Sequence, residues 1–161
     1  MANAGPLLEQ ILRAMRETHI EGILIGNSAV AIQGAPVTTD DFDFYFRATP
    51  QNLKKLSQMA AKLQAPLTQP HYPLSHLYRM KNLDAGIQVD MMASLTGVRS
   101  YESVRSRATR SQVAGESIWV ASLEDVIKMK RSANRPKDLA VLPVLEQTLA
   151  EKKLLDAEKK A

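Results

Sequence analysis

Residues 39–46 read Thr-Asp-Asp-Phe-Asp-Phe-Tyr-Phe, and this alternation of acidic and aromatic side chains is typical of a β-strand. Successive side chains of a strand point to opposite faces, so Phe42 and Phe44 are predicted to enter the core and Asp41 and Asp43 to share the other face. Residues two apart on a strand are separated by roughly 6.5–7 Å. Unpaired carboxylates at this distance raise each other's pKa, and a divalent cation between them would relieve the repulsion. The simpler alternative is a solvated strand face that carries two acids.

The composition is ordinary for a soluble globular protein, with 45% apolar and 24% charged residues in a chain of 161. This length predicts one domain over residues 1–161, with a core at about 20–120 and C-terminal helices at about 122–155. The absence of cysteine excludes disulfides, thiolate metal sites and a cysteine nucleophile. No apolar run is long enough for a membrane span and no signal peptide is recognisable, so we expect a cytoplasmic protein without a membrane partner.

The net charge of +4 and the pI of about 9.4 mildly favour anionic partners such as nucleotides or nucleic acid. Much of the excess lies near the C-terminus, where a solvated tail is an equally good explanation: Lys152, Lys153, Lys159 and Lys160. A second basic cluster surrounds a helix predicted at residues 101–108, and it either faces solvent or contacts phosphate or nucleic acid: Arg99, Arg105, Arg107 and Arg110.

Periodicity and capping signals place the other elements along the chain. Further helices are predicted at residues 6–18, 50–64, 122–133 and 136–149. Further strands are predicted at residues 77–80, 86–92 and 117–120. Residues 65–73 are rich in Pro, Gln and Thr and are predicted to form a loop at the edge of a pocket.

A glycine turn lies upstream of the acidic stretch. Residues 22–26 form a short apolar strand that ends at Gly26, and Asn27 and Ser28 lead into a short helix predicted at residues 29–33. Glycine lets the backbone approach a ligand, Ser28 is a candidate helix cap, and the amides of a helix N-terminus suit a phosphate. The motif is neither a GxGxxG fingerprint nor a P-loop, so by itself it is weak.

Asp90 is an acid in the middle of an apolar strand, where a metal or a substrate hydroxyl would supply the partner that a buried acid needs. If this strand lies beside the acidic strand, Asp41, Asp43 and Asp90 meet above one face of a sheet. Three carboxylates can hold two Mg²⁺ ions, one of which carries nucleotide phosphates while the other activates a hydroxyl whose proton Asp90 takes. The pattern therefore favours phosphoryl or nucleotidyl transfer.

Together these motifs resemble the minimal nucleotidyltransferases of the DNA polymerase beta superfamily. The resemblance spans roughly residues 20–145 and is carried by Ile-Gly-Asn-Ser-Ala-Val-Ala at 25–31, Thr-Asp-Asp-Phe-Asp at 39–43 and Val-Asp at 89–90. The stretches at 122–130 and 134–139 resemble the C-terminal part of many bacterial members, including abortive-infection toxin types. The resemblance implies an α/β (α+β) fold in which helices pack on a small mixed β-sheet.

The resemblance also implies a Mg²⁺-dependent enzyme that moves a nucleoside monophosphate from a triphosphate such as ATP to a hydroxyl acceptor. Asp41, Asp43 and Asp90 would be the catalytic residues and the ligands of two Mg²⁺ ions, for which Mn²⁺ could substitute. The nucleotide-binding residues that it implies are Gly26, Asn27, Ser28, Lys130 and Arg135. The acceptor, whether a small molecule, a protein or an RNA end, stays open, as do the preferred nucleotide and the oligomeric state.

Two positions depart from the family pattern. Asn27 stands where Gly or Ser usually follows the first glycine, and Val37 stands where many relatives have Arg. Both changes favour a second interpretation, a catalytically inactive nucleotidyltransferase-like subunit that binds a protein partner, as in a toxin–antitoxin pair. A metal-dependent phosphoesterase on another fold is the third interpretation. The order of the strands discriminates between the first and the third interpretation, because the leading mechanism requires Asp90 to lie beside Asp41 and Asp43.

Overall fold

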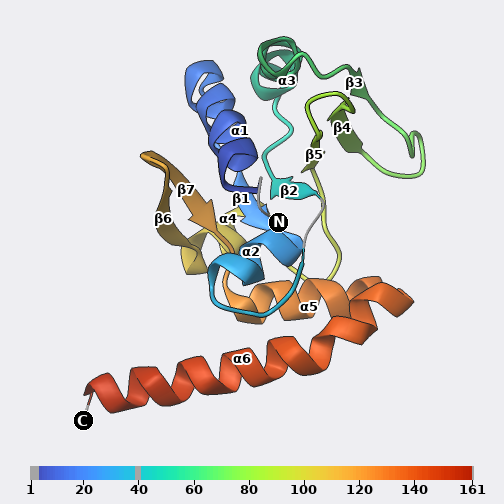
Figure 1. The fold of residues 1–161 in the computed structure, drawn as a ribbon. Helices are drawn as coiled ribbons and strands as arrows, with labels where there is room; N and C mark the ends of the chain where they lie inside the picture. The colour runs from blue at the N-terminus through green and yellow to red at the C-terminus, as the bar shows by residue number, and fades with distance from the viewer. Residues whose placement is uncertain (1–3, 39–40, 161) are drawn as a thin grey trace.

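A computed structural model describes residues 4–38 and 41–160, so Thr39 and Asp40 of the acidic stretch lie outside the described residues. The first half contains α1 (Ala4–Thr18), β1 (Ile23–Ile25), α2 (Gly26–Ile32), β2 (Phe42–Tyr45), α3 (Pro50–Leu63), β3 (Leu67–Thr68) and β4 (Leu77–Asn82) (Figure 1). The second half contains β5 (Ile87–Met92), α4 (Tyr101–Arg107), β6 (Thr109–Val113), β7 (Glu116–Val120), α5 (Leu123–Ala133) and α6 (Pro136–Lys160).

Within the described residues, the strands form one seven-stranded sheet in the order β3-β4-β5-β2-β1-β7-β6. The sheet is mixed, because β2 runs antiparallel to β1 but parallel to β5, and β1 runs parallel to β7. The outer pairs β3–β4, β4–β5 and β6–β7 are antiparallel. The predicted fold class, a mixed sheet with helices packed on it, is confirmed.

Strand β2 follows the predicted alternation. Phe42, Phe44 and Phe46 are all buried, and burial of such side chains stabilises the fold by about 1.5–3 kcal/mol each. On the opposite face Tyr45 is also buried, because its ring packs edge-on against Tyr101 of α4 at a centroid distance of 5.5 Å. Helix α4 therefore covers one end of this face and leaves the end with the acids open.

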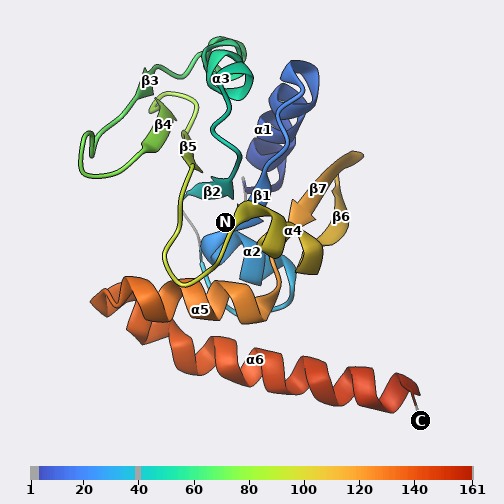
Figure 2. The same ribbon diagram turned by 180° about the vertical axis from the view of Figure 1, so that it is seen from behind.

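The helices occupy two sides of the molecule. Helix α1 contacts α3 and the outer strands β6 and β7, while α2 contacts β1, β2 and α5. Helix α6 packs along α5, and Figure 2 shows α4 and the segment after β5 from behind. Thr49 and Ser122 cap α3 and α5, whose first turns donate backbone N–H groups to the two hydroxyls.

The largest differences from the prediction concern α2, β3 and α6, while several other elements begin or end one or two residues from their predicted bounds. Helix α2 begins at Gly26 rather than at residue 29, and Ser28 is not its cap, because Ser28 lies inside the helix and its hydroxyl donates to the Ile25 carbonyl at 3.2 Å. The short strand β3 lies within the predicted loop at 65–73. Helix α6 continues past residue 149 to Lys160, because its last turns consist of strong helix formers.

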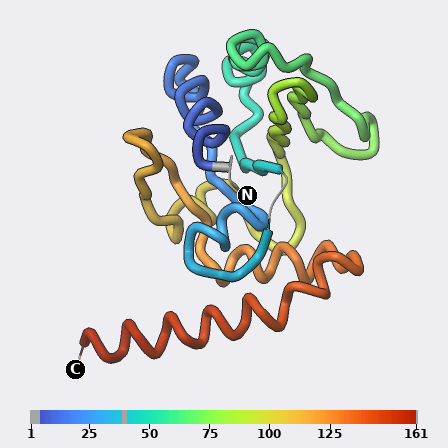
Figure 3. Tube along the Cα trace, in the orientation of Figure 1, coloured from blue at the N-terminus to red at the C-terminus, as the bar shows by residue number. Residues whose placement is uncertain are grey.

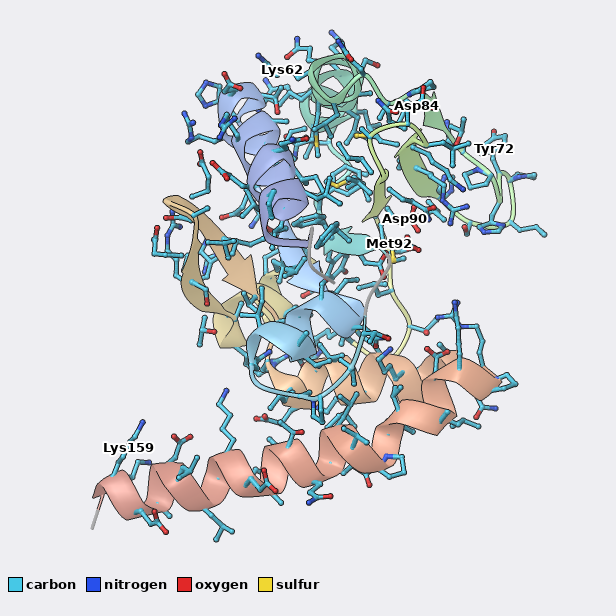
Figure 4. All side chains as sticks on the ribbon, in the orientation of Figure 1. Lys62, Tyr72, Asp84, Asp90, Met92 and Lys159 are labelled. Atoms are coloured by element: carbon cyan, nitrogen blue, oxygen red, sulfur yellow. The ribbon has the colours of Figure 1, made fainter. Side chains whose placement is uncertain are left out.

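The last turns of α6 run away from the rest of the chain, as the tube in Figure 3 and the position of Lys159 in Figure 4 show. In the described part of the chain, no helix has both the length and the apolar character needed to span a membrane.

Candidate active site

The parallel pairing of β2 with β5 brings the predicted acids together. In the register of these strands Asp43 lies directly opposite Asp90, and Asp41 precedes the first residue of β2. The Gln88 side chain on β5 donates to a carboxylate oxygen of Asp41 at 3.2 Å, so Asp41 is also tied to β5. The strand order that the leading mechanism required is therefore present.

The pKa of Asp43 is strongly shifted by its surroundings. Burial, and then the negative charges of Asp90 and Asp41, raise the pKa of Asp43 to about 7, while Lys130 and Lys137 oppose this shift. Near neutral pH this carboxylate is held in an environment that penalises its charge. A perturbed carboxylate in a cleft is a recurrent feature of functional sites.

Asp90 has a partner that sequence reasoning missed. Arg79 on β4 donates from Nε and Nη2 to the two carboxylate oxygens of Asp90 at 2.8 and 3.1 Å, and the Asp90 side chain is 8% exposed. The expectation that a metal or a hydroxyl supplies the partner of Asp90 was therefore incomplete. Part of the signal was present in the sequence, because only a short connection separates the strands predicted at residues 77–80 and 86–92. In the β4–β5 hairpin that these strands form, Arg79 lies opposite Asp90.

Gly26 brings the turn after β1 against Asp43. Its φ is +68°, and a Cβ at this position would lie 2.8 Å from a carboxylate oxygen of Asp43. Asn27 donates to the Thr38 carbonyl at 3.2 Å, and its side-chain oxygen is buried without a hydrogen-bond partner among the described residues. Ser28 is buried and bonded to its own helix, so it does not line the site.

Lys130 and Arg135 approach the acids from α5 and from the turn before α6, and both bind Asp138. Arg135 Nε lies 2.6 Å from Asp138 and Lys130 Nζ lies 3.8 Å from it. Burial lowers the pKa of Lys130. Burial alone would raise the pKa of Asp138, but the hydrogen bond and charge of Arg135 and the charge of Lys130 lower it overall. Asp138 is 2% exposed and holds the two basic groups beside the acids.

Two adjoining cavities meet at Asp41 and Asp43. The helix-side cavity, of about 310 Å³, is lined by Gly26, Asn27, Thr38, Asp41, Asp43, Lys130, Arg135, Lys137 and Asp138. The hairpin-side cavity, of about 380 Å³, is lined by Asp41, Asp43, His71, Ser75, His76, Leu77, Arg79, Asp90, Met92, Ser94, Leu95, Thr96, Arg135 and Lys137. A larger cavity of about 620 Å³ between α1 and β7 contains none of the three acids.

Figure 4 shows the setting of the hairpin-side cavity, with Asp90 and Met92 on β5 and Tyr72 on the long connection between β3 and β4. His71, Ser75 and His76 come from this connection, as expected for a loop at the edge of a pocket. Thr38, Lys137 and Asp138 line the helix-side cavity and were not predicted as site residues.

A divalent cation fits the donor set of the site. Carboxylate oxygens are the ligands that Mg²⁺ prefers; burial is the largest cause of the raised pKa of Asp43, and the charges of Asp90 and Asp41, which a cation would offset, add to it. The oxygens of Asp90 keep lone pairs beyond those that the Arg79 hydrogen bonds use. Within residues 4–38 and 41–160, no three His, Asp or Glu side chains already form a metal-binding group, so the acids would have to turn toward a bound ion.

The basic cluster around α4 is not part of this site. Arg107 donates to the buried Asp125 at 2.9 and 3.0 Å, and Arg105 lies over the Trp119 ring and pairs with Glu21 at 3.3 Å. Neither cavity at the acids is lined by any of the four arginines of the cluster. Arg110 also lies over the Trp119 ring, 5.2 Å from its centroid. Three of the four arginines thus have structural partners, and none is placed for phosphate contact at the acids.

A prediction for Gly26 follows from its contact with Asp43. Gly26→Ala is expected to destabilise the protein by about 1–2 kcal/mol, because an L-residue is strained at positive φ, and also to displace the Asp43 carboxylate. Gly86→Ala is the matched control, since Gly86 has a φ of +71° but nothing within 4 Å of its Cβ position. Urea unfolding should show similar losses for both variants, whereas only Gly26→Ala should lower Mg²⁺–ATP binding. If the two variants bind Mg²⁺–ATP equally well, the close contact between Gly26 and Asp43 is not needed for nucleotide binding.

The mixed sheet and the paired acids define the nucleotidyltransferase fold, and solved structures with this fold match the chain over most of its length. The antibiotic-resistance factor ANT(2'')-Ia matches in a solution structure with a TM-score of 0.65 and 16% identity, over 99% of this chain and 92% of that one. The same protein, crystallised with adenylyl-2''-tobramycin, matches with a TM-score of 0.63 and 18% identity, over 96% of this chain and 95% of that one.

A candidate nucleotidyltransferase from Thermotoga maritima matches with a TM-score of 0.53 and 16% identity, over 94% of this chain and 92% of that one. At these identities the likeness concerns the fold. No curated protein matches the sequence significantly. Residues 6–160 match the family described as "Nucleotidyl transferase of unknown function (DUF2204)", and the chain belongs to this family. It is therefore a nucleotidyltransferase by class, as predicted.

Proposed function

We propose that this protein is a Mg²⁺-dependent enzyme that transfers a nucleoside monophosphate from a nucleoside triphosphate to a hydroxyl acceptor. The observation that carries the proposal is the register of β2 and β5, which sets Asp43 opposite Asp90 where two cavities meet. One cavity is rich in groups that suit a triphosphate, and the other adjoins the acid that would receive a proton.

The helix-side cavity would hold the triphosphate. Lys130, Arg135 and Lys137 supply positive charge there, and the Gly26 turn lets the backbone come close to a phosphate. The Asp138 carboxylate keeps Lys130 and Arg135 in place through contacts of 3.8 and 2.6 Å. ATP is the first nucleotide to test, because the structural neighbour ANT(2'')-Ia was crystallised with an adenylylated product.

Asp41, Asp43 and Asp90 would hold two Mg²⁺ ions, with Mn²⁺ as a substitute. Such ions offset charge on the phosphates and acidify a bound hydroxyl. Asp43 would then carry its charge at neutral pH, because a cation offsets the two carboxylates that raise its pKa.

The acceptor would lie in the hairpin-side cavity, next to Asp90. Its hydroxyl oxygen attacks the α-phosphorus, the bond from that phosphorus to pyrophosphate breaks, and the hydroxyl proton passes to a carboxylate oxygen of Asp90. Arg79 orients this carboxylate by its two hydrogen bonds and keeps it facing the cavity that both residues line.

Titration calorimetry with ATP tests the proposal. Wild-type protein should bind ATP only with Mg²⁺, and the double change Asp41→Asn, Asp43→Asn should weaken binding at least about tenfold, because it removes two of the proposed metal ligands. Asp84→Asn is the matched control, because it replaces an aspartate by asparagine in the exposed turn between β4 and β5, away from the site (Figure 4).

If folded wild-type protein binds no triphosphate with Mg²⁺, the proposal fails and a subunit that acts by binding a protein partner becomes the better interpretation. Binding that the double variant retains would show that the acids are not the metal ligands.

A further inference from the structure

The charges that line the hairpin-side cavity do not suit a cationic acceptor. Asp41, Asp43 and Asp90 are the acids among its described lining residues. The same lining contains the basic side chains Arg79, Arg135 and Lys137, of which Arg135 pairs with Asp138, together with His71 and His76. Once metal ions offset the three carboxylates, no acid of the described lining remains to pair with an ammonium group of an acceptor.

Arg79 is the cation nearest to the proposed proton acceptor. Two of its N–H groups bind Asp90 at 2.8 and 3.1 Å, and a guanidinium carries more donors than these two bonds use. The Arg79 side chain is 29% exposed and lines the cavity, whereas the Asp90 side chain is 8% exposed. Arg79 can therefore hold Asp90 and still donate to an anion in the cavity.

This arrangement penalises a polyamine and favours a phosphate. Ammonium groups would approach like charges in a partly enclosed site, and such juxtapositions are strongly unfavourable. A phosphate oxygen would accept charge-assisted hydrogen bonds from Arg79 and pair with Lys137, which reaches the cavity from the start of α6. The cavity volume of about 380 Å³ suits a small molecule.

We propose, building on the function proposed above, that the acceptor is a small hydroxyl compound that carries a phosphate group, and that Arg79 recognises this phosphate beside the reacting hydroxyl. Arg79 lines only the hairpin-side cavity, whereas Lys137 lines both cavities and also serves the triphosphate, so recognition of the acceptor rests chiefly on Arg79 with Lys137 at the boundary. In this respect the chain differs from the neighbour ANT(2'')-Ia, whose crystallised product derives from tobramycin.

Binding alone tests this inference, with three glucose derivatives that share one ring and differ in charge and with the polycationic aminoglycoside tobramycin. Protein is first saturated with Mg²⁺ and a non-hydrolysable ATP analogue, and then titrated with glucose 6-phosphate, glucose, glucosamine and tobramycin. Glucose 6-phosphate is expected to bind about 10- to 100-fold more tightly than glucose or glucosamine, as charge-assisted hydrogen bonds imply. Tobramycin is expected to bind no better than glucosamine.

Two variants test whether the preference for glucose 6-phosphate depends on Arg79 and Lys137. Arg79→Lys keeps the charge but loses the bidentate geometry, and it should retain only part of the preference for glucose 6-phosphate. Lys137→Gln leaves the Arg79–Asp90 pair intact and should also reduce the preference, so the test holds even if changes at Arg79 disturb folding. Arg79→Lys should still bind the nucleotide analogue. Lys137→Gln should bind it more weakly, because Lys137 also lines the helix-side cavity, so both sugar titrations are run at saturating analogue.

Tighter binding of tobramycin, no preference for the phosphate, or a preference that both variants keep would overturn the inference. Binding of a short RNA in place of glucose 6-phosphate would overturn it as well, because the occupant would then be a nucleic-acid end. If the nucleotide analogue itself does not bind, the proposed function has failed; if it binds and the sugars show no phosphate preference, only this inference has failed.

Discussion

Asp43→Asn is expected to lower nucleotidyl transfer at least about 100-fold and, at the same time, to make the metal-free protein more stable at pH 8. The loss of transfer follows because Asp43 lies opposite Asp90 where the two cavities meet and is a proposed ligand of both metal ions. The gain in stability follows because burial, and then the charges of Asp90 and Asp41, raise the pKa of Asp43 to about 7.

The sign of the pH dependence comes from comparing folded and unfolded states. An acid whose folded pKa is raised favours folding while it is protonated, and this contribution is complete below the unfolded pKa of about 3.9 and lost as pH rises to about 7. Asparagine is neutral throughout. The stability advantage of Asp43→Asn should therefore be absent near pH 4 and reach on the order of 2–4 kcal/mol at pH 8.

Urea unfolding of metal-free protein at several pH values measures this effect, and pyrophosphate release from ATP measures transfer. Mg²⁺ should stabilise the wild-type protein at pH 8 more than the variant, because it offsets the charge that asparagine lacks. Asp84→Asn should change neither property, since Asp84 is exposed. A variant that is no more stable than wild type at pH 8 would show that the carboxylate is not strained in the metal-free protein.

Asp90→Asn is expected to reduce transfer by about 10²- to 10⁴-fold, the usual contribution of a positioned proton acceptor. An amide cannot accept the hydroxyl proton, although its oxygen can still receive a hydrogen bond from Arg79. Binding of Mg²⁺–ATP should fall by no more than about threefold, because Asp41 and Asp43 remain as proposed ligands of the ion on the triphosphate and Asp90 does not line the helix-side cavity that would hold the triphosphate.

Pyrophosphate release and calorimetry on the same preparation separate the two effects of Asp90→Asn, and circular dichroism checks that the variant is folded. Asp90→Glu restores the charge and should recover part of the rate. Transfer above a tenth of the wild-type rate in Asp90→Asn would remove Asp90 from the role of proton acceptor. An equal loss of binding and transfer would assign it to metal binding alone.

Local sequence pattern was sufficient for most elements of the fold. The alternation at residues 42–46 sets three aromatic rings into the core, and the Thr49 and Ser122 caps begin α3 and α5 where expected. These features depend on side chains within a few residues of each other, so the sequence specifies them directly. The errors were also local: Ser28 bonds inside α2, and α6 continues to Lys160.

Which residues come together in the site depended on contacts between distant parts of the chain. Nothing near Asp43 in the sequence says that β2 runs parallel to β5 or that Asp90 is its register partner, because that pairing spans 47 residues and follows from packing of the whole sheet. The same holds for Lys130, whose charge acts on Asp43 from α5, 87 residues further along the chain. Periodicity identifies which acids leave the core, whereas long-range strand pairing and helix packing determine which of them meet and which cations they meet.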